Sequence, residues 1–272
     1  MTTTLTGADI GARLTRLRQA APLVHSLTNY VAMNSAANVL LAVGASPAMV
    51  HAREEAAEFA ALADAVLINI GTLSPHWVEA MVEAATSAGE HQTPWVLDPV
   101  AVGATAYRRE SAARLLDLRP SVIRGNASEI IALAEDGLGG RGVDSTAASD
   151  DAVQAAVALA RRQEAVVAVT GEVDLVTDGR RLVRVPGGHP LMPRVTALGC
   201  ALSGVVAAFL ATDQDPLVAT CAALACYGEA GSRAGRTAQG PGSFAVAFVD
   251  ALHQLNPETL LRREALAIES LD

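Results

Sequence analysis

The chain has 272 residues, of which 51% are apolar and only 3% aromatic, and it carries a formal net charge of −9. This composition is typical of a folded globular protein whose core is built mainly from Ala, Val and Leu. The net charge of −9 argues against a nucleic-acid-binding protein, which would need a basic face. It can still bind a nucleotide, provided that helix termini, a few arginines and a metal ion neutralise the phosphates locally.

The absence of several residues and motifs excludes further classes of protein. All 20 basic residues are arginine, so a Walker A loop, which needs a lysine, is impossible. The three cysteines form no CxxC pair and are expected to be reduced thiols. No signal-peptide core stands at the start of the sequence, and no run of about 18 apolar residues predicts a membrane span. We therefore expect a cytoplasmic protein that makes no membrane contact.

Hydrophobic periodicity predicts an alternation of helices and strands. Helices are expected over residues 8–20, 30–42, 54–63, 77–88, 108–118, 127–134, 150–162, 199–210, 216–231, 243–254 and 257–268. Strands are expected over residues 23–27, 45–50, 65–70, 95–98, 122–124 and 165–170, followed by a hairpin of residues 174–177 and 182–185. Thr28-Asn29 and Asn126 are candidate helix caps, Pro47 suggests an edge strand, and Asp178-Gly179 suits the hairpin turn.

This alternation, with short and continuously apolar strands, predicts an α/β fold around a central, mainly parallel β-sheet. No Pro-, Gly- or Ser-rich linker divides the chain, so residues 1–272 are expected to form a single domain. Ligands of open α/β sheets bind at the carboxyl ends of the strands, and polar residues gather there in this sequence. These ends are Asn69-Ile70-Gly71-Thr72, Asp98-Pro99-Val100, Arg124-Gly125-Asn126, Thr170-Gly171-Glu172 and the Thr196–Cys200 turn.

The last of these turns leads into a run of small and apolar residues, which predicts a buried helix whose first turn carries Gly199 and Cys200. Free N–H groups and the positive end of the helix dipole make such a first turn a potential anion site. A thiol placed there is expected to ionise more readily than a free one. The alternative is that Gly199 only begins the helix and Cys200 packs as a small apolar side chain.

Other candidate chemistry is limited. Asp98 and Glu129 are the carboxylates best placed to hold Mg²⁺, although Glu129 can instead belong to a capping arrangement with Asn126. The stretch from Gly137 to Gly142 is a literal GxGxxG, but it follows a predicted helix and therefore has the wrong context for a dinucleotide site. The six histidines show no zinc-binding spacing. A Cys200 nucleophile activated by a histidine such as His189 remains open.

Seven segments, in order from about residue 20 to residue 254, carry a resemblance to a known family. They are Leu27-Thr28-Asn29-Tyr30-Val31, Gly44-Ala45-Ser46-Pro47-Ala48-Met49, Leu67-Ile68-Asn69-Ile70-Gly71-Thr72-Leu73, Leu97-Asp98-Pro99-Val100, Ile123-Arg124-Gly125-Asn126, Thr170-Gly171-Glu172-Val173-Asp174 and Gly240-Pro241-Gly242-Ser243-Phe244. In combination the sequence resembles hydroxyethylthiazole kinase, the thiamine-salvage member of the ribokinase-like superfamily.

The resemblance implies a three-layer ribokinase-like fold. It also implies that ATP, with Mg²⁺, phosphorylates the hydroxyl of 4-methyl-5-(2-hydroxyethyl)thiazole for thiamine biosynthesis. A homotrimer with active sites near its subunit interfaces is implied as well. By motif position, Arg124 and Thr170 would contact the ATP phosphates, while Asp98 and Glu129 would serve the metal directly or through water. The remaining implied site residues are Met49, Asn29 and Ala197 at the thiazole, and Cys200 and Gly199 at the reacting hydroxyl and phosphoryl group.

One position departs from the family pattern, which resembles Val-Thr-Gly-x-Gly-Cys. Here the residues are Val195-Thr196-Ala197-Leu198-Gly199-Cys200, with alanine in place of the first glycine. If this turn requires a positive φ, Ala197 would be strained by about 1–3 kcal/mol. Two alternative functions stay open: a kinase or ATP-dependent dehydratase of the same fold acting on another small molecule, and a catalytically weak ligand-binding or regulatory protein.

Overall fold

The computed structural model describes residues 3–135 and 148–271; the GxGxxG stretch from Gly137 to Gly142 lies outside them. The described residues form one ten-stranded sheet in the order β3-β2-β4-β5-β6-β7-β8-β9-β10-β1. The parallel part consists of β3 (Ser46–Ala48), β2 (Leu23–Leu27), β4 (Ala65–Asn69), β5 (Trp95–Asp98), β6 (Val122–Asn126) and β7 (Val166–Thr170). The antiparallel part consists of β8 (Val173–Thr177), β9 (Arg181–Pro186), β10 (Leu266–Ser270) and β1 (Thr3–Leu5).

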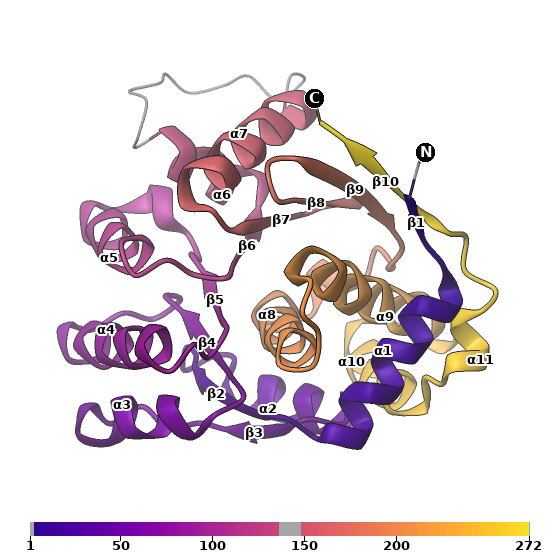
Figure 1. The fold of residues 1–272 in the computed structure, drawn as a ribbon. Coiled ribbons are helices and arrows are strands. Elements are labelled where there is room, and N and C mark those ends of the chain that lie inside the picture. Colours follow the sequence, from indigo (N-terminus) through magenta and orange to yellow (C-terminus); the bar gives the residue numbers. More distant parts are fainter. Residues whose placement is uncertain (1–2, 136–147, 272) are drawn as a thin grey trace.

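Helices cover both faces of the curved sheet and complete a three-layer arrangement (Figure 1). One layer contains α3 (Arg53–Leu62), α4 (Pro75–Glu90), α5 (Ala106–Leu116), α6 (Ala127–Glu135) and α7 (Ala148–Gln163). The other contains α1 (Gly7–Ala20), α2 (Met33–Val43), α8 (Leu198–Leu210), α9 (Pro216–Thr237), α10 (Pro241–Gln254) and α11 (Pro257–Leu260). Two 3₁₀ helices, η1 (Val102–Ala104) and η2 (Met192–Arg194), lie in the connections. None of the described helices is long and apolar enough to cross a membrane.

The pleat of the parallel strands determines which side chains reach α8. In β5, Val96 packs in the core beneath α8, whereas Leu97 packs in the core on the opposite face. Because side chains alternate along a strand, the next residue, Asp98, lies on the α8 side. The same alternation directs three further polar side chains to that side: Asn69 of β4, Arg124 of β6 and Thr170 of β7.

Most expected elements are confirmed, including a short edge strand at Pro47 and a helix from residue 198 to 210 that is buried from Ala201 onward. The helix expected from residue 30 begins instead at Met33. The reason lies in the preceding turn, where Asn29 Oδ1 accepts hydrogen bonds from the N–H groups of Val31 and Ala32. Asn29 thus orders the turn before the helix rather than the first turn of the helix itself.

The prediction of a helix over residues 257–268 is wrong. The helix ends at Leu260, and residues 266–270 form β10, which pairs antiparallel with β9 on one side and with β1 on the other. Leu266 is buried in this strand. Pairing with a strand from the middle of the chain therefore overrides a local sequence that is compatible with a helix. The strand β1 was not expected, since three residues are too few to show a periodic pattern.

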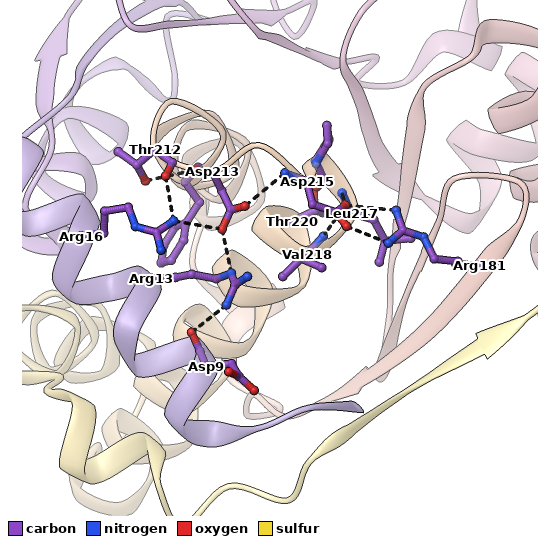
Figure 2. Close-up of polar contacts among 12 residues, drawn as sticks. Asp9, Arg13, Arg16, Arg181, Thr212, Asp213, Asp215, Leu217, Val218 and Thr220 are labelled. Atoms are coloured by element: carbon purple, nitrogen blue, oxygen red, sulfur yellow. Dashed lines mark hydrogen bonds and ion pairs between the residues drawn. The ribbon is translucent and has the colours of Figure 1, made fainter. Parts of the chain in front are cut away.

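Charged residues on the turn between α8 and α9 connect three distant segments (Figure 2). Asp213 pairs with Arg13 of α1 at 2.7 Å. Asp215 caps α9 by accepting hydrogen bonds from Leu217 N and Val218 N, and its two oxygens accept 2.7 and 3.1 Å bonds from Arg181 of β9. Burial raises the pKa of Asp215, but the hydrogen bonds and charge of Arg181 outweigh it and hold this pKa below the ordinary value.

Replacing Asp215 by Ala removes this cap and both bonds to Arg181. We expect the free energy of unfolding to fall by about 1–3 kcal/mol at neutral pH. Because the folded-state pKa is lower than the unfolded one, this stabilisation is present above the unfolded pKa and is lost as the pH falls through the folded pKa. Urea unfolding of parent and variant should therefore give curves that converge below about pH 3.

The matched control is Glu79→Ala, which breaks an ion pair with Arg114 in which both side chains are exposed. It should cost at most about 1 kcal/mol. Equal losses in the two variants would contradict the assigned role of Asp215.

Candidate active site

Polar groups from five strands meet the amino terminus of α8 at one edge of the sheet. The helix packs against β2, β4 and β5, so its first turn stands over the carboxyl ends of those strands. Seven of the residues singled out from the sequence lie in this region: Asn29, Asp98, Arg124, Thr170, Ala197, Gly199 and Cys200. The fold thus brings together segments that are up to 171 positions apart in the sequence.

Asp98 is the buried centre of the region, with 1% of its surface exposed. Its Oδ2 accepts hydrogen bonds from Asn69 Nδ2 at 2.7 Å and from Ser203 Oγ at 2.8 Å. Its Oδ1 is buried and has no hydrogen-bond partner among the described residues. Burial raises the pKa of Asp98 to about 6, although the Arg124 charge and the two hydrogen bonds act in the opposite direction.

Asn29 connects this centre to Cys200. Its Nδ2 donates to Asn69 Oδ1 at 2.8 Å and to Cys200 Sγ at 3.3 Å. The thiol is partly exposed in the first turn of α8, so a small molecule can reach it. The described residues show no hydrogen bond between Cys200 and a histidine, and His189 instead stacks on Phe244. The arrangement offers a substrate hydroxyl a thiol and an oriented amide.

The expectation that Cys200 ionises readily is wrong. Burial raises the pKa of the Cys200 thiol, and the negative charge of Asp98 raises it further. Asn29 and Arg124 act in the opposite direction without reversing the shift. The helix terminus favours the thiolate, but a nearby buried carboxylate and loss of water outweigh it. In this state of the site Cys200 is a neutral thiol at neutral pH.

Arg124 joins the strand ends to the helix. Its Nη2 donates to Thr170 Oγ1 at 2.6 Å, its Nη1 donates to the carbonyl oxygen of Gly199 at 3.1 Å, and Nη1 lies 3.8 Å from Asp98 Oδ2. A Cβ added to Gly199 would lie 3.4 Å from this guanidinium, so glycine permits the close approach. A planar cation with further N–H groups beside a helix amino terminus is well suited to binding phosphate oxygens.

Ala197 is the residue immediately before α8 and has φ = 68° and ψ = −8°. The turn therefore requires the left-handed conformation that glycine adopts readily and alanine does not. Because φ is positive, the backbone of Ala197 is strained, as expected for an alanine in such a turn. The side chain of Ala197 also supplies no hydrogen-bond acceptor for the first N–H groups of the helix, which keeps them available for a ligand.

Glu129 forms the capping arrangement that was its alternative interpretation. Its Oε2 accepts the N–H of Asn126 at 2.8 Å, while Asn126 Oδ1 accepts the N–H of Glu129 at 3.0 Å. Its Oε1 reaches the loop after β5 and accepts the N–H of Ala101 at 2.9 Å. Glu129 therefore ties the end of β5 to the end of β6, and its charge also acts on Asp98.

Met49 follows the edge strand β3 and is partly buried against the core on the α8 side. Two histidines hold its loop to the end of β2. His51 lies 3.0 Å from the carbonyl oxygen of Met49 and 3.3 Å from that of Thr28, and His25 Nε2 lies 2.9 Å from the carbonyl oxygen of Val50. These bonds fix the loop at the same edge of the sheet, and among the described residues no hydrogen bond joins Met49 to the network around Asp98.

Three residues with defined positions in the region had no role in the sequence analysis. Asn69 stood among the polar strand ends without an assignment, and Ser203 was counted in an apolar run; its spacing of three residues after Cys200 could have placed it on the same helix face. Arg108 donates to the carbonyl oxygens of Ile70, Gly71 and Val100 and so joins the loops after β4 and β5. The acceptors of Arg108 are all backbone carbonyl oxygens, which every residue has, so no pattern in the sequence indicates this role.

A cavity of about 1060 Å³ lies at the opposite, amino-terminal end of the strands. Its lining includes Arg119, Arg161, Arg181 and Asp178. Arg119 pairs with Glu164, and Arg181 pairs with Asp178 and Asp215, so much of its charge is neutralised within the protein. The linked groups around Asp98 are the stronger candidate for chemistry.

The chain is also similar to known proteins over most of its length. Residues 14–258 match the sequence model of the hydroxyethylthiazole kinase family. A hydroxyethylthiazole kinase from Cereibacter sphaeroides is 62% identical over 252 residues, which are 93% of this chain and 96% of that protein. Another from Rhizobium leguminosarum bv. trifolii is 58% identical over 258 residues, which are 94% of this chain and 97% of that protein.

Solved structures extend the comparison. The hydroxyethylthiazole kinase protein of Pyrococcus horikoshii OT3 has a TM-score of 0.88 at 42% identity, covering 97% of this chain and 99% of that one. Pyridoxal kinase of Staphylococcus aureus has a TM-score of 0.60 at 18% identity, covering 79% of this chain and 89% of that one, and supports the fold alone. The expected three-layer ribokinase-like fold is confirmed.

The conformation of Ala197 leads to a stability prediction. Ala197→Gly should raise the free energy of unfolding by about 0.5–1 kcal/mol, because relief of the left-handed strain exceeds the added flexibility of the unfolded chain. Ala201→Gly, inside α8, is the control and should destabilise by about 1 kcal/mol or more. Denaturant unfolding measures both, and a loss of stability in Ala197→Gly would contradict strain at this turn.

Proposed function

The chain belongs to the hydroxyethylthiazole kinase family, and on this premise we propose that it transfers the γ-phosphoryl group of ATP to the hydroxyl of 4-methyl-5-(2-hydroxyethyl)thiazole in thiamine salvage. One observation carries the proposal. A continuous set of hydrogen bonds links a substrate-accessible thiol, Cys200, through two buried amides to Asp98, which stands beside Arg124. A hydroxyl acceptor and a polyphosphate therefore have binding groups side by side.

On the acceptor side, the thiazole alcohol places its hydroxyl at Cys200, within reach of the Asn29 amide. Met49 packs against the thiazole ring, and Ala197 borders the ring at the start of α8. A neutral thiol is a weak general base, so Cys200 shapes the pocket and accepts a hydrogen bond rather than driving the reaction. General-base assistance typically contributes about 10²–10⁴-fold, whereas phosphoryl transfer depends mainly on positioning and charge neutralisation.

On the donor side, Arg124 binds the ATP phosphates through the guanidinium N–H groups that its contacts with Thr170 and Gly199 leave over. Thr170 fixes the guanidinium plane and borders the same phosphates. The N–H groups at Gly199 and Cys200 bind the oxygens of the transferring phosphoryl group, with the helix dipole favouring the negative charge. These groups occupy fixed positions before the substrate arrives, so little reorganisation is needed.

The donor set also suits Mg²⁺, which binds through one or two carboxylates and substrate phosphates. Asp98 offers the unpartnered buried oxygen Oδ1 for such an ion. Both oxygens of Glu129 already accept backbone N–H groups, so Glu129 would serve the ion through water. When bound, Mg²⁺ would neutralise charge on the phosphates. Within the described residues no group of three or more His, Cys, Asp or Glu side chains forms a metal cage, in keeping with an ion shared with the nucleotide.

A homotrimer with active sites near the subunit interfaces is part of this proposal. Tyr30 and Val31, which follow Asn29, leave 71% and 59% of their surfaces exposed. Such apolar exposure beside the acceptor site supports coverage by a neighbouring subunit.

The direct test is incubation of the purified chain with Mg·ATP and the thiazole alcohol. We expect a phosphate ester of the alcohol and an equal amount of ADP, measured by mass spectrometry and a coupled assay. Binding of the alcohol without an ester would favour a ligand-binding or regulatory protein. ATP turnover that the alcohol does not stimulate would favour a kinase or dehydratase for another small molecule.

Cys200→Ala should lower kcat only moderately, by about 10-fold or less, because the thiol is neutral and most of the rate comes from positioning and charge. Steady-state kinetics with Cys200→Ser as the size-matched control measures this effect. Loss of several orders of magnitude in Cys200→Ala would instead indicate that the thiol acts as an essential base or nucleophile.

A further inference from the structure

Asn69, at the carboxyl end of β4, uses both ends of its side-chain amide. Its Oδ1 accepts hydrogen bonds from Asn29 Nδ2 at 2.8 Å and from Gly71 N at 2.9 Å. Its Nδ2 donates to Asp98 Oδ2 at 2.7 Å. The side chain is completely buried, so it acts on a substrate only through the groups it holds.

The direction of these bonds is fixed by groups that can only donate or only accept. The N–H groups of Val31 and Ala32 donate to Asn29 Oδ1, so Asn29 must turn its Nδ2 toward Asn69 and Cys200. The N–H of Gly71 and the amide of Asn29 both require an acceptor, so Asn69 must turn its Nδ2 toward Asp98. A flip of either amide would turn its NH₂ group toward N–H donors and its oxygen toward acceptors, which opposes both flips.

Packing reinforces this orientation. A Cβ on Gly71 would lie 2.5 Å from Asn29 Nδ2, so only glycine lets the backbone approach the amide this closely. Ser203 donates independently to the same Asp98 oxygen that Asn69 contacts, which leaves Oδ1 as the free oxygen of that carboxylate. The amide of Asn69 therefore joins Asn29, on the acceptor side of the site, to Asp98, on the phosphate side.

We infer that Asn69 is a positioning residue that holds the Asn29 amide against the Cys200 thiol and, together with Ser203, sets which oxygen of Asp98 is free. Its effect on catalysis rests on the proposed function, whereas the orientation of Asn29 does not. Groups that hold a binding residue in place typically affect activity by about 10–100-fold. The two arms of Asn69 can be separated by substitution, because one is an acceptor and the other a donor.

Two substitutions at position 69 separate these arms. Asn69→Leu has nearly the same shape and removes both, so kcat should fall by about 10–100-fold and the KM for the thiazole alcohol should rise several-fold. Asn69→Asp keeps the acceptor for Asn29 but replaces the N–H donor to Asp98 by a second carboxylate, which repels Asp98 or shares a proton with it. It should lower kcat while leaving the thiazole KM within about twofold of the parent value.

Ser203→Ala removes only the second donor to Asp98 and should likewise lower kcat without raising the thiazole KM. The control for an added charge is Asn256→Asp, at the N-cap of α11, where Asp caps as well as Asn. It should leave both kinetic constants unchanged. Thermal unfolding of each variant gives the folded fraction on which kcat is calculated.

A readout independent of turnover is hydrogen exchange of the Asn29 side-chain amide, followed by NMR. We expect slow exchange in the parent and exchange at least about tenfold faster in Asn69→Leu, because that amide loses its buried acceptor. This result supports the inference even if the parent does not phosphorylate the thiazole alcohol, an outcome that would overturn only the proposed function.

The inference is overturned if folded Asn69→Leu keeps kcat and thiazole KM within twofold of the parent and the Asn29 amide exchanges at the parent rate. If Asn69→Leu does not fold, the decision passes to Asn69→Asp. An unchanged kcat in that variant overturns the inference, and a reduced kcat with an unchanged thiazole KM supports it.

Discussion

The burial of one carboxylate, Asp98, sets the requirements for the surrounding site. Removing a carboxylate from water is costly unless hydrogen bonds and an opposite charge compensate. Asn69 and Ser203 supply the hydrogen bonds, and Arg124 supplies the charge from 3.8 Å. Compensation is incomplete, since one oxygen has no hydrogen-bond partner among the residues that the structure describes and the pKa is raised to about 6. The Asp98 carboxylate is thus an incompletely compensated negative group, and a cation that binds there would be strongly attracted to it.

An acidic protein that handles a polyphosphate must concentrate positive potential in one place. Here the first turn of α8, preceded by a residue without a capping side chain, lies against the Arg124 guanidinium. Hydrogen bonds to Thr170 and to the carbonyl oxygen of Gly199 hold the guanidinium against the helix, so both sources of positive potential keep their positions without the ligand. The same crowding explains why the Cys200 thiol is not activated: burial raises its pKa, and the charge of Asp98 raises it further. The charges in this site therefore stabilise a bound phosphate more than they activate the Cys200 thiol.

Elements of the fold were predictable from the sequence where their pattern is local or directly repeated. The parallel strands β2 and β5 have the predicted bounds, and the polar residues at the strand ends converge as the parallel topology requires. Prediction failed where a residue distant in the sequence determines the secondary structure or the pKa. Residues 266–270 become a strand because β9 offers an edge, and the pKa of Cys200 depends on a carboxylate 102 positions away in the chain. The links made by Arg108 and Glu129 to backbone atoms have no counterpart in side-chain patterns.

The pairing of β1 with β10 has a consequence for synthesis of the chain. Thr3 lies opposite Ile268, so β1 is synthesised long before the strand with which it pairs. Until residues 266–270 emerge, β9 presents an unpaired edge, and β1 has no sheet to join. This edge can close only after residues 266–270 have been synthesised, because a contact between strands so far apart in the sequence cannot form before both strands exist. During that interval the exposed edge of β9 is the segment most open to pairing with another chain.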